Sequence, residues 1–311
     1  MHTTVTSPRR FSGGARRGIQ TAHEVSHVTP QSARCFKIWS TKRDIDLIIT
    51  DVDGTLLNSD QKLTERTVQH IRLAEDAGVP LMIATGKAYG PWTNEILPAL
   101  ASPMPQVYLQ GLFIRDVDGN EMSSRVLDRD ILCQVVELAA ALSLTLVLYS
   151  SDRIICQERN HQTDRLIFYG EPTPEGVGPV VPFLESTDVR IHKCIFMADD
   201  DAIAAARPVV QGQFRDEVSL TSAISGMLEV LPANSSKGRG VEFVLNTLNI
   251  APERCMALGD GENDVEMLRM VGLGIAVGNA TEKAKEASDI VLDYTNDQDA
   301  VAEAISRYIL S

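Results

Sequence analysis

The sequence lacks three features that would each point to a particular class of protein. Its five cysteines are scattered without a CxxC pair, which favours free thiols in a reducing compartment over a disulfide framework or a zinc site. Its best candidate for a membrane span, residues 138–149, is interrupted by Ser143 and Thr145 and is shorter than the ~20 residues that a bilayer requires. Positive charge is scarce, with 29 Lys and Arg against 42 Asp and Glu and a formal net charge of -13, which argues against a polyanion-binding surface. We therefore expect no membrane and no nucleic acid as a partner, and a monomer by default.

The basic residues that are present gather in the N-terminal segment, residues 1–43. This segment is rich in Ser and Arg, carries eight basic residues against one acidic residue, Glu24, and has no sustained apolar run. Such a composition is typical of an organelle transit peptide rather than a secretory signal, with a plastid ahead of a mitochondrion as the destination. The alternatives are a disordered basic tail and an upstream extension that is never translated, and in either case we expect a cytoplasmic protein. We leave 1–43 out of the fold prediction.

The rest of the chain alternates between short apolar runs and amphipathic segments, which indicates an α/β fold. Residues 45–50 and 79–84 are expected to be strands buried on both faces, with a helix at 64–77 between them that Thr64 caps and Gly78 ends. The alternation returns near the C-terminus, with helices expected at 237–248, 265–270, 282–287 and 300–309 and strands at 255–258, 274–277 and 290–292. We predict a doubly wound parallel sheet.

The middle of the chain breaks this alternation. Between residues 122 and 225 it mixes a helix, several short strands and turns rich in Gly and Pro. We therefore predict an inserted α+β domain at 122–225, and a core domain formed by residues 44–121 together with 226–311. A length of 311 residues suits either one large domain or two moderate ones.

Polar motifs follow the expected strands of the core and begin one of its helices. Because the carboxyl ends of parallel strands meet at one edge of a sheet, these motifs should share a rim. They are Asp51-Val52-Asp53-Gly54-Thr55, Thr85-Gly86-Lys87, Lys237-Gly238-Arg239-Gly240 and Gly259-Asp260-Gly261-Glu262-Asn263-Asp264. Clustered carboxylates repel one another unless a cation lies between them, and oxygen-only ligands favour Mg²⁺. A metal, a lysine and amide donors together form a receptacle for phosphate.

In this order, the four motifs resemble those of the haloacid dehalogenase (HAD) superfamily of phosphatases. The large insert after the second motif, with Leu228-Glu229-Val230-Leu231-Pro232 ahead of Lys237, is similar to the Cof-type branch with its C2-type cap. The resemblance runs from about residue 46 to the C-terminus, and it implies a HAD-like core with an α+β cap that determines substrate specificity. Lys87 departs from the pattern, since the branch often has Arg at this position.

The resemblance also implies a role for each matching residue. Asp51 would be the nucleophile that forms an aspartyl-phosphate, and Asp53 would be the general acid and base. Asp51, Asp260 and the backbone carbonyl of Asp53 would hold Mg²⁺, while Asp264 would orient Lys237 or a water at the metal. The phosphoryl oxygens would be bound by Thr85, Gly86, Lys237 and Asn263.

The implied activity is that of a Mg²⁺-dependent phosphomonoesterase acting on a small phosphorylated metabolite, such as a sugar phosphate, a nucleotide or a riboflavin-pathway intermediate. Two alternatives stay open at this point. A phosphomutase or phosphotransferase would share the nucleophile but exclude water from the aspartyl-phosphate. A non-catalytic regulatory protein would bind a phosphate ligand without turning it over.

Four other patterns have simpler explanations than a functional site. Residues 116–119 repeat the Asp-Val-Asp-Gly of the first motif, but an Asp-Gly hairpin turn accounts for them better. The glycines of 272–278 bracket an expected strand rather than opening a helix, which argues against a dinucleotide loop. The acids at 199–201 indicate the start of a helix. His161 and His192 are expected to be surface or packed histidines, with substrate contact by His161, beside Arg159 and Asp164, as the alternative.

Overall fold

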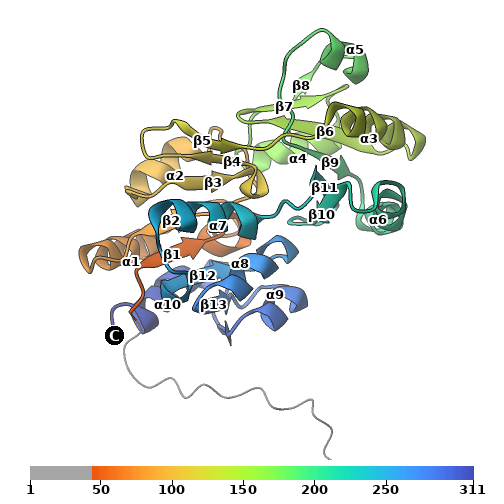
Figure 1. Cartoon of the computed structure of the whole chain (residues 1–311). Coiled ribbons are helices and arrows are strands. Elements are labelled where there is room, and N and C mark those ends of the chain that lie inside the picture. Colours follow the sequence, from red (N-terminus) through yellow and green to blue (C-terminus); the bar gives the residue numbers. More distant parts are fainter. Residues whose placement is uncertain (1–43) are drawn as a thin grey trace, which may run out of the picture. The chain divides into compact units, whose positions relative to one another are not determined.

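A computed structural model describes residues 44–311, so the predicted targeting segment 1–43 lies outside the described residues (Figure 1). Among the described residues, every helix is too short or too polar to cross a bilayer. The described part contains a parallel sheet, a second, six-stranded sheet and a small three-stranded sheet.

The parallel sheet has five strands in the order β14-β13-β12-β1-β2. This is the doubly wound parallel sheet that the sequence predicts, although the sequence alone predicts no strand order. The strands are β1 (Leu47–Thr50), β2 (Leu81–Ile83), β12 (Cys255–Gly259), β13 (Leu273–Ala276) and β14 (Ile290–Val291). All neighbouring pairs are parallel, and every residue of β1 and β12 is buried. The chain order runs in opposite directions on the two sides of β1. The carboxyl ends of β1, β2 and β12 therefore meet at the point where ligands bind in such sheets.

The helices of this region agree closely with the prediction. They are α1 (Glu65–Asp76), α7 (Lys237–Leu248), α8 (Val265–Met270), α9 (Glu282–Ala287) and α10 (Ala300–Tyr308). Thr64 caps α1 by accepting the N–H of Thr67, and Ser236 caps α7 by accepting the N–H of Arg239. Helix α1 packs against α10, and α7 against α8. The crossover from β1 to β2 through α1 and that from β12 to β13 through α8 run in opposite directions along the sheet. Right-handed connections therefore place these two helices on opposite faces of the sheet.

One part of the core was not predicted. Helix α2 (Thr93–Leu100) and the antiparallel strands β3 (Gln106–Tyr108), β4 (Phe113–Arg115) and β5 (Glu121–Ser124) follow β2 in the chain. Strand β5 crosses residue 122, where the sequence predicts the insert to begin, because it pairs with β4. Helix α2 contains Pro98, and each of these strands has only three or four residues, so no clear periodicity marks them. The predicted hairpin turn at 116–119 is confirmed, because Gly119 donates its N–H to the Asp116 carbonyl between β4 and β5.

The insert builds a six-stranded sheet in the order β10-β11-β9-β6-β7-β8. The strands are β6 (Thr145–Ser150), β7 (Arg153–Cys156), β8 (Glu175–Gly176), β9 (Lys193–Met197), β10 (Val218–Thr221) and β11 (Met227–Pro232). The helices are α3 (Arg129–Ala141), α4 (His161–Phe168), α5 (Val180–Glu185) and α6 (Asp200–Phe214). Strand β11 lies past residue 225, where the sequence predicts the return to the core, because its residues pair with β9 and β10 rather than with the parallel sheet.

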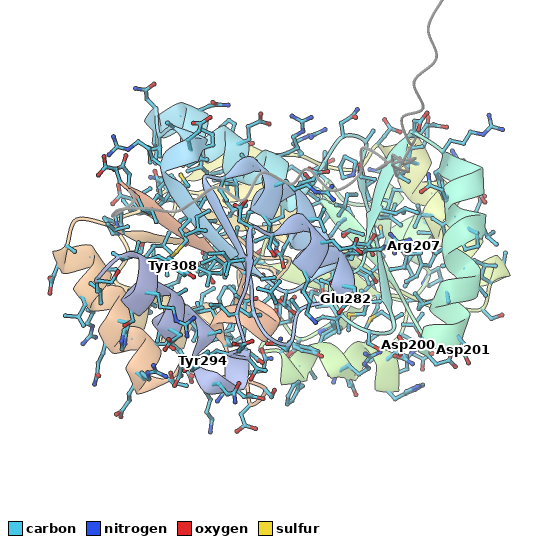
Figure 2. All side chains as sticks on the ribbon, turned by 90° about the horizontal axis from the view of Figure 1, so that it is seen from below. Asp200, Asp201, Arg207, Glu282, Tyr294 and Tyr308 are labelled. Carbon is cyan, nitrogen blue, oxygen red and sulfur yellow. The ribbon has the colours of Figure 1, made fainter. Side chains whose placement is uncertain are left out.

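Side chains of this sheet alternate between two apolar layers. Leu148, Phe196 and Leu228 pack into a cluster of the insert, whereas Tyr149 and Ile195 pack into the cluster that contains the core strands. The second face is therefore the one that the insert turns toward the core. Helix α6 begins at the predicted acids, with Asp199 accepting the N–H of Ala202. The next two acids, Asp200 and Asp201, are labelled in Figure 2.

His192 is a packed histidine, as one of the two expectations has it. It is fully buried, its Nδ1 accepts the N–H of Ser151 at 3.2 Å, and its Nε2 lies 3.1 Å from the Ser124 hydroxyl. Burial and the nearby Arg190 lower the pKa of His192 to about 4, against an opposing effect of Glu121. The folded protein therefore holds this imidazole neutral, with its remaining proton on Nε2.

Replacing Gly240 in α7 should destabilise the fold. A Cβ at Gly240 would lie 2.4 Å from the Cα of Gly111, so the helix would have to move off the segment beneath it. We expect Gly240→Ala to lower the free energy of unfolding by about 1–3 kcal/mol in urea titrations. Gly212→Ala, in α6, is the matched control: a Cβ there meets nothing within 4 Å, and we expect a gain of roughly 0.5–1 kcal/mol. Equal effects of the two changes would contradict the packing account.

The neutral His192 should make stability fall in acid. Because its folded pKa is below the usual value of 6.5, its contribution is present above pH 6.5 and is lost as the pH falls toward 4. We expect the free energy of unfolding of the wild type, relative to His192→Gln, to drop by about 1–2 kcal/mol between pH 7 and pH 5. The other titrating groups are shared by the two proteins, so parallel pH profiles would refute this assignment.

Candidate active site

The structure brings the predicted motifs to one edge of the parallel sheet. Asp51 directly follows β1, Thr85 follows β2 closely, Asp260 directly follows β12, and Lys237 is the first residue of α7. A tight turn at Val52–Leu56 follows Asp51, with Gly54 at φ 73°. A Cβ at Gly54 would lie 2.5 Å from Asp260 Oδ2, so glycine both allows this backbone conformation and makes room for the second carboxylate.

Lys237 joins two of these acids. Its Nζ lies 2.7 Å from Asp51 Oδ1 and 2.6 Å from Asp264 Oδ1, and only 1% of Lys237 is exposed. The other oxygen of Asp264 accepts the N–H groups of Asp260 at 3.0 Å and Gly261 at 2.9 Å. Burial lowers the pKa of Lys237, but Asp264 and Asp51 outweigh it and raise the pKa above its usual range. The ammonium is therefore charged, and Asp264 fixes both the lysine and the loop after β12.

Three carboxylates are crowded together here. Asp51, Asp260 and Asp264 each offer an oxygen within 4.8 Å of the others. Burial raises the pKa of Asp51 well above its usual range, with Asp264 adding to it, and the same two causes raise the pKa of Asp260 to about 7. Thr55 donates its hydroxyl to Asp260 Oδ1 at 2.8 Å, which orients that carboxylate. Carboxylate oxygens confined in this way have the donor chemistry that suits a hard divalent cation.

Lys87, a residue of the second motif, holds the Asp53 carboxylate in place. Lys87 Nζ lies 2.7 Å from Asp53 Oδ1 and 3.2 Å from Gln61 Oε1, and Lys87 is 3% exposed. The ammonium also lies 5.4 Å from the Trp92 ring centre and 5.7 Å from that of Tyr169. Sequence reasoning noted Lys87 only as a departure from the family pattern, and missed its contact with Asp53.

The remaining predicted phosphate-binding residues lie in different positions. Gly86 and Asn263 line the same cavity as Asp51 and Asp53. Thr85 is fully buried, its hydroxyl accepts the N–H of Lys87 at 3.1 Å, and it does not line that cavity. Lys237 lines an adjoining groove together with Asn263.

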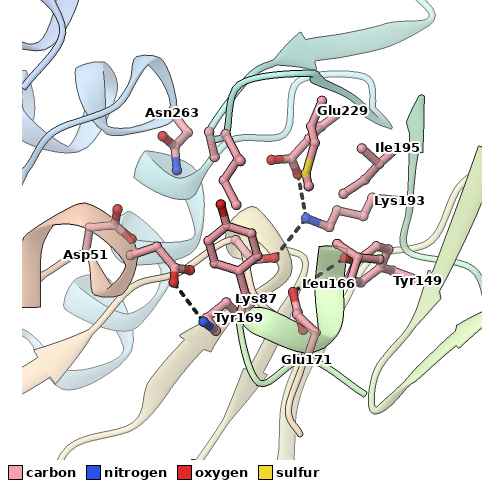
Figure 3. A pocket seen from close by; sticks show the side chains of 15 residues that line it. Asp51, Lys87, Tyr149, Leu166, Tyr169, Glu171, Lys193, Ile195, Glu229 and Asn263 are labelled. Atoms are coloured by element: carbon pink, nitrogen blue, oxygen red, sulfur yellow. Dashed lines mark hydrogen bonds and ion pairs between the residues drawn. The ribbon is translucent and has the colours of Figure 1, made fainter. Parts of the chain in front are cut away.

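A small cavity of about 40 Å³ lies between the core and the insert (Figure 3). The insert contributes both polar and apolar side chains to its wall. The polar ones are Tyr149, Tyr169, Glu171, Lys193 and Glu229, and the apolar ones are Leu166, Ile195, Ala223, Ile224 and Met227. His161, Arg159 and Asp164 are exposed and do not line this cavity, so the structure gives no support to substrate contact by His161.

The buried charges of the insert were missed by sequence reasoning. Lys193 and Glu229 are 2% and 3% exposed; Lys193 begins, and Glu229 lies within, an otherwise apolar strand. A charge in such a strand was the signal that could have found them, because burying it requires a partner. Glu171 was also missed. It accepts the N–H of Ala88 at 3.0 Å, and burial raises its pKa to about 7, against Lys87 and Lys193.

The insert also contacts the core beside the three clustered carboxylates of Asp51, Asp260 and Asp264. Arg207 of α6, labelled in Figure 2, forms a two-pronged ion pair with Glu262, whose carboxylate is also 3.3 Å from Lys283 Nζ. Glu262 belongs to the loop that carries Asp260, Asn263 and Asp264. This contact therefore links the position of the insert to the loop that completes the cluster.

Comparison with known proteins places these features in a family. A model of haloacid dehalogenase-like hydrolases matches residues 48–305. A relative from Arabidopsis thaliana, named chloroplastic endoribonuclease YBEY, is 34% identical over 278 residues; the match covers 86% of this chain but 47% of the relative, so the chain spans about half of that protein. A Bacillus subtilis relative, named 5-amino-6-(5-phospho-D-ribitylamino)uracil phosphatase, is 30% identical, with 86% of this chain and 97% of the relative covered.

Solved structures agree on the fold. A haloacid dehalogenase-like hydrolase from Bacteroides thetaiotaomicron superposes with a TM-score of 0.74 at 25% identity, covering 85% of this chain and 99% of the other. A HAD/Cof-like hydrolase from Plasmodium vivax superposes with a TM-score of 0.78 at 23% identity, over 85% and 95% of the two chains. The chain therefore belongs to the haloacid dehalogenase-like hydrolases, as a Cof-type member of that family.

Proposed function

We propose that this protein is a phosphomonoesterase that hydrolyses a small organic phosphate through a phosphorylated Asp51. The observation that carries the proposal is the position of Asp51 on the wall of the cavity between core and insert, with its carboxylate paired to the buried Lys237. Relatives named as phosphatases support it. A buried carboxylate beside a fixed ammonium can attack phosphorus while the surroundings hold the charge of the phosphoryl group.

In the first step, an oxygen of Asp51 forms a bond to phosphorus and the bond from phosphorus to the ester oxygen breaks. The proton that the leaving oxygen needs comes from the carboxyl group of Asp53, two residues along the same turn. Lys87 Nζ, 2.7 Å from Asp53 Oδ1, keeps that carboxyl directed at the cavity. Lys237 and the donors at Gly86 and Asn263 bind the phosphoryl oxygens, while Thr85 holds the backbone at Lys87.

In the second step, a water attacks phosphorus on the acylphosphate and the bond to Asp51 breaks. Asp53, now ionised, accepts the proton that the water loses. Inorganic phosphate leaves, and Asp51 returns to its carboxylate form beside Lys237. The two steps together consume one water and leave both aspartates as they began.

The residues present fit a magnesium ion. The donors are all oxygens, and the carboxylates of Asp51 and Asp260 lie close together. Lys237 pairs with Asp51, but it is shared with Asp264. We propose that Asp51, Asp260 and the backbone carbonyl of Asp53 hold Mg²⁺, which supplies the positive charge that a phosphate dianion needs next to a carboxylate. Asp264 has both oxygens engaged by Lys237 and backbone N–H groups, which suits an orienting role.

We assign substrate choice to the insert, drawn at 122–225 from the sequence and continued by β11. The core residues of the cavity hold the reacting group, so the leaving group faces side chains such as Tyr149, Tyr169 and Met227. Sugar phosphates, nucleotides and riboflavin-pathway intermediates are the candidates. A relative named for a riboflavin-pathway-type substrate favours testing that class first, and one named HMP-PP phosphatase adds a pyrimidine-type phosphate to the panel.

We also propose a location. The basic composition of 1–43 and the chloroplastic relative support a plastid, with a mitochondrion as the second destination. The protein acts there as a monomer on a free metabolite.

Replacing the nucleophile should abolish turnover. We expect Asp51→Asn to lower kcat by about 1,000-fold or more for every ester that the wild type hydrolyses, measured as phosphate release across the candidate panel. Asp116→Asn is the matched control, because Asp116 opens the similar Asp-Val-Asp-Gly sequence but lies in the turn between β4 and β5. Full activity in Asp51→Asn would sink the proposal. An isomerised product without free phosphate would indicate a phosphomutase instead.

Removal of the metal should have the same effect reversibly. We expect chelation to abolish phosphate release and Mg²⁺ to restore it, with Ca²⁺ less effective because it favours more ligands and longer bonds. Asp260→Asn should raise the Mg²⁺ concentration for half-maximal activity by about 10-fold or more, whereas Asp116→Asn should leave it unchanged. Undiminished activity in excess chelator would show that the carboxylate cluster serves another purpose.

A further inference from the structure

A chain of buried hydrogen bonds connects the insert to the phosphate-binding positions of the core. Lys193 Nζ donates to Glu229 Oε2 and, at 2.8 Å, to the carbonyl oxygen of Gly86. Glu229 Oε1 accepts from Gln110 Nε2 at 2.8 Å, and Gln110 Oε1 accepts from Asn263 Nδ2 at 3.2 Å. The four side chains of Lys193, Glu229, Gln110 and Asn263, which we call the buried relay, are each at most 8% exposed.

The relay has only one consistent direction. An ammonium can only donate, so Lys193 requires an acceptor, and the Glu229 carboxylate accepts at both of its oxygens. Gln110 must therefore turn its NH₂ group toward Glu229, which leaves its oxygen for Asn263. Asn263 in turn must present its NH₂ group to Gln110. The charges of Lys193 and Glu229 therefore determine that the NH₂ group of Asn263, and not its oxygen, faces Gln110.

The direction matters because Asn263 lines the cavity beside Asp51. Figure 3 shows its amide nitrogen pointing into the pocket, where its second hydrogen can be donated to a phosphoryl oxygen. Its carbonyl oxygen is buried next to Gly261, and within residues 44–311 it has no hydrogen-bond partner. Leaving that oxygen unpaired costs about 1–3 kcal/mol, so the neighbouring groups, and not the amide's own hydrogen bonding, impose this orientation. Reversing the amide would set its oxygen against both the Gln110 oxygen and the negative phosphoryl group.

We propose that Glu229 is a positioning residue, which makes Asn263 a phosphate donor by fixing the direction of the relay. This rests on the proposed function, since it concerns how the same site binds a phosphoryl group. Lys193 adds a second link between the insert and the phosphate site, because its ammonium donates to the carbonyl of Gly86. Gly86 is the other phosphate-binding position on the cavity wall. Both donors are thus set by two strands of the insert, β9 and β11, so the phosphate site is complete only while the insert is seated on the core.

The substitution Glu229→Gln should reverse the relay. Lys193 would donate to the oxygen of the new amide, and the NH₂ group of that amide would face Gln110. Gln110 would then turn its own NH₂ group to Asn263, which would have to present its oxygen. The double change Glu229→Gln with Gln110→Glu should restore the direction, because a carboxylate at position 110 accepts both from the new amide and from Asn263. The two variants differ by one carboxylate within the relay.

The experiment measures the dissociation constant of inorganic phosphate by calorimetry with saturating Mg²⁺, and the kcat and KM of the best ester. We expect Glu229→Gln to weaken phosphate binding by about 10- to 100-fold and the double change to recover most of that loss. The proposal is overturned if Glu229→Gln binds phosphate like the wild type, if the double change binds as weakly as the single one, or if the wild type does not bind phosphate.

If the doubly substituted protein does not fold, a double-mutant cycle between Glu229 and Asn263 still tests the proposal. Asn263→Ala should weaken phosphate binding to a similar extent, and adding Glu229→Gln to it should cost little more, because both remove the same donor. Additive losses would mean that Glu229 acts by another route. Phosphate binding that responds as expected without hydrolysis of any ester would count against the phosphatase proposal alone, whereas hydrolysis with unaltered phosphate binding in Glu229→Gln would count against the relay alone.

Discussion

The buried Lys237 ammonium is the contact on which the site depends. A charge removed from water needs anionic partners, and Lys237 has Asp51 and Asp264 at 2.7 and 2.6 Å. The three residues come from the end of β1, the start of α7 and the loop after β12, so the ion pair fixes these elements relative to one another. A lysine in the first turn of a helix is disfavoured by the helix dipole, and the two carboxylates offset that cost. Loss of either carboxylate would leave Lys237 with a single anionic partner.

Two further acids of the cavity wall are paired with a lysine in the same way. Lys87 pairs with Asp53, and Lys193 with Glu229. The lysines are thus already partly neutralised before a substrate arrives, and Lys237 is shared between two carboxylates. A phosphate dianion that entered would meet little net positive charge. This is the physical reason for a divalent cation between Asp51 and Asp260, and it explains why amide donors such as Asn263 must be oriented in advance rather than adjust to the ligand.

Much of this could be predicted from the sequence where the signals are local. Helices α7, α8 and α9 have the predicted bounds, and the family motifs mark the strand ends that carry Asp51 and Asp260. The start of α7 is marked locally by its cap, Ser236, and its length by an apolar face that is buried in the structure. Helix α2 and strands β3–β5 were missed because they are short and Pro98 interrupts the helix. The relay could not be predicted, since Gln110 lies 119 residues from Glu229 and 153 from Asn263 in the chain. Only tertiary packing brings such amides together, and a lone glutamine carries no sign of its partners.

The central claim is that Asp51 carries the phosphoryl group between substrate and water. The most direct test is acid quenching of the Mg²⁺-loaded enzyme during turnover, followed by peptide mapping by mass spectrometry. We expect a phosphorylated peptide with the modification on Asp51, present only while substrate remains. Turnover that proceeds with no phosphorylated peptide at any quench time, or with the phosphoryl group on another residue, would contradict this claim.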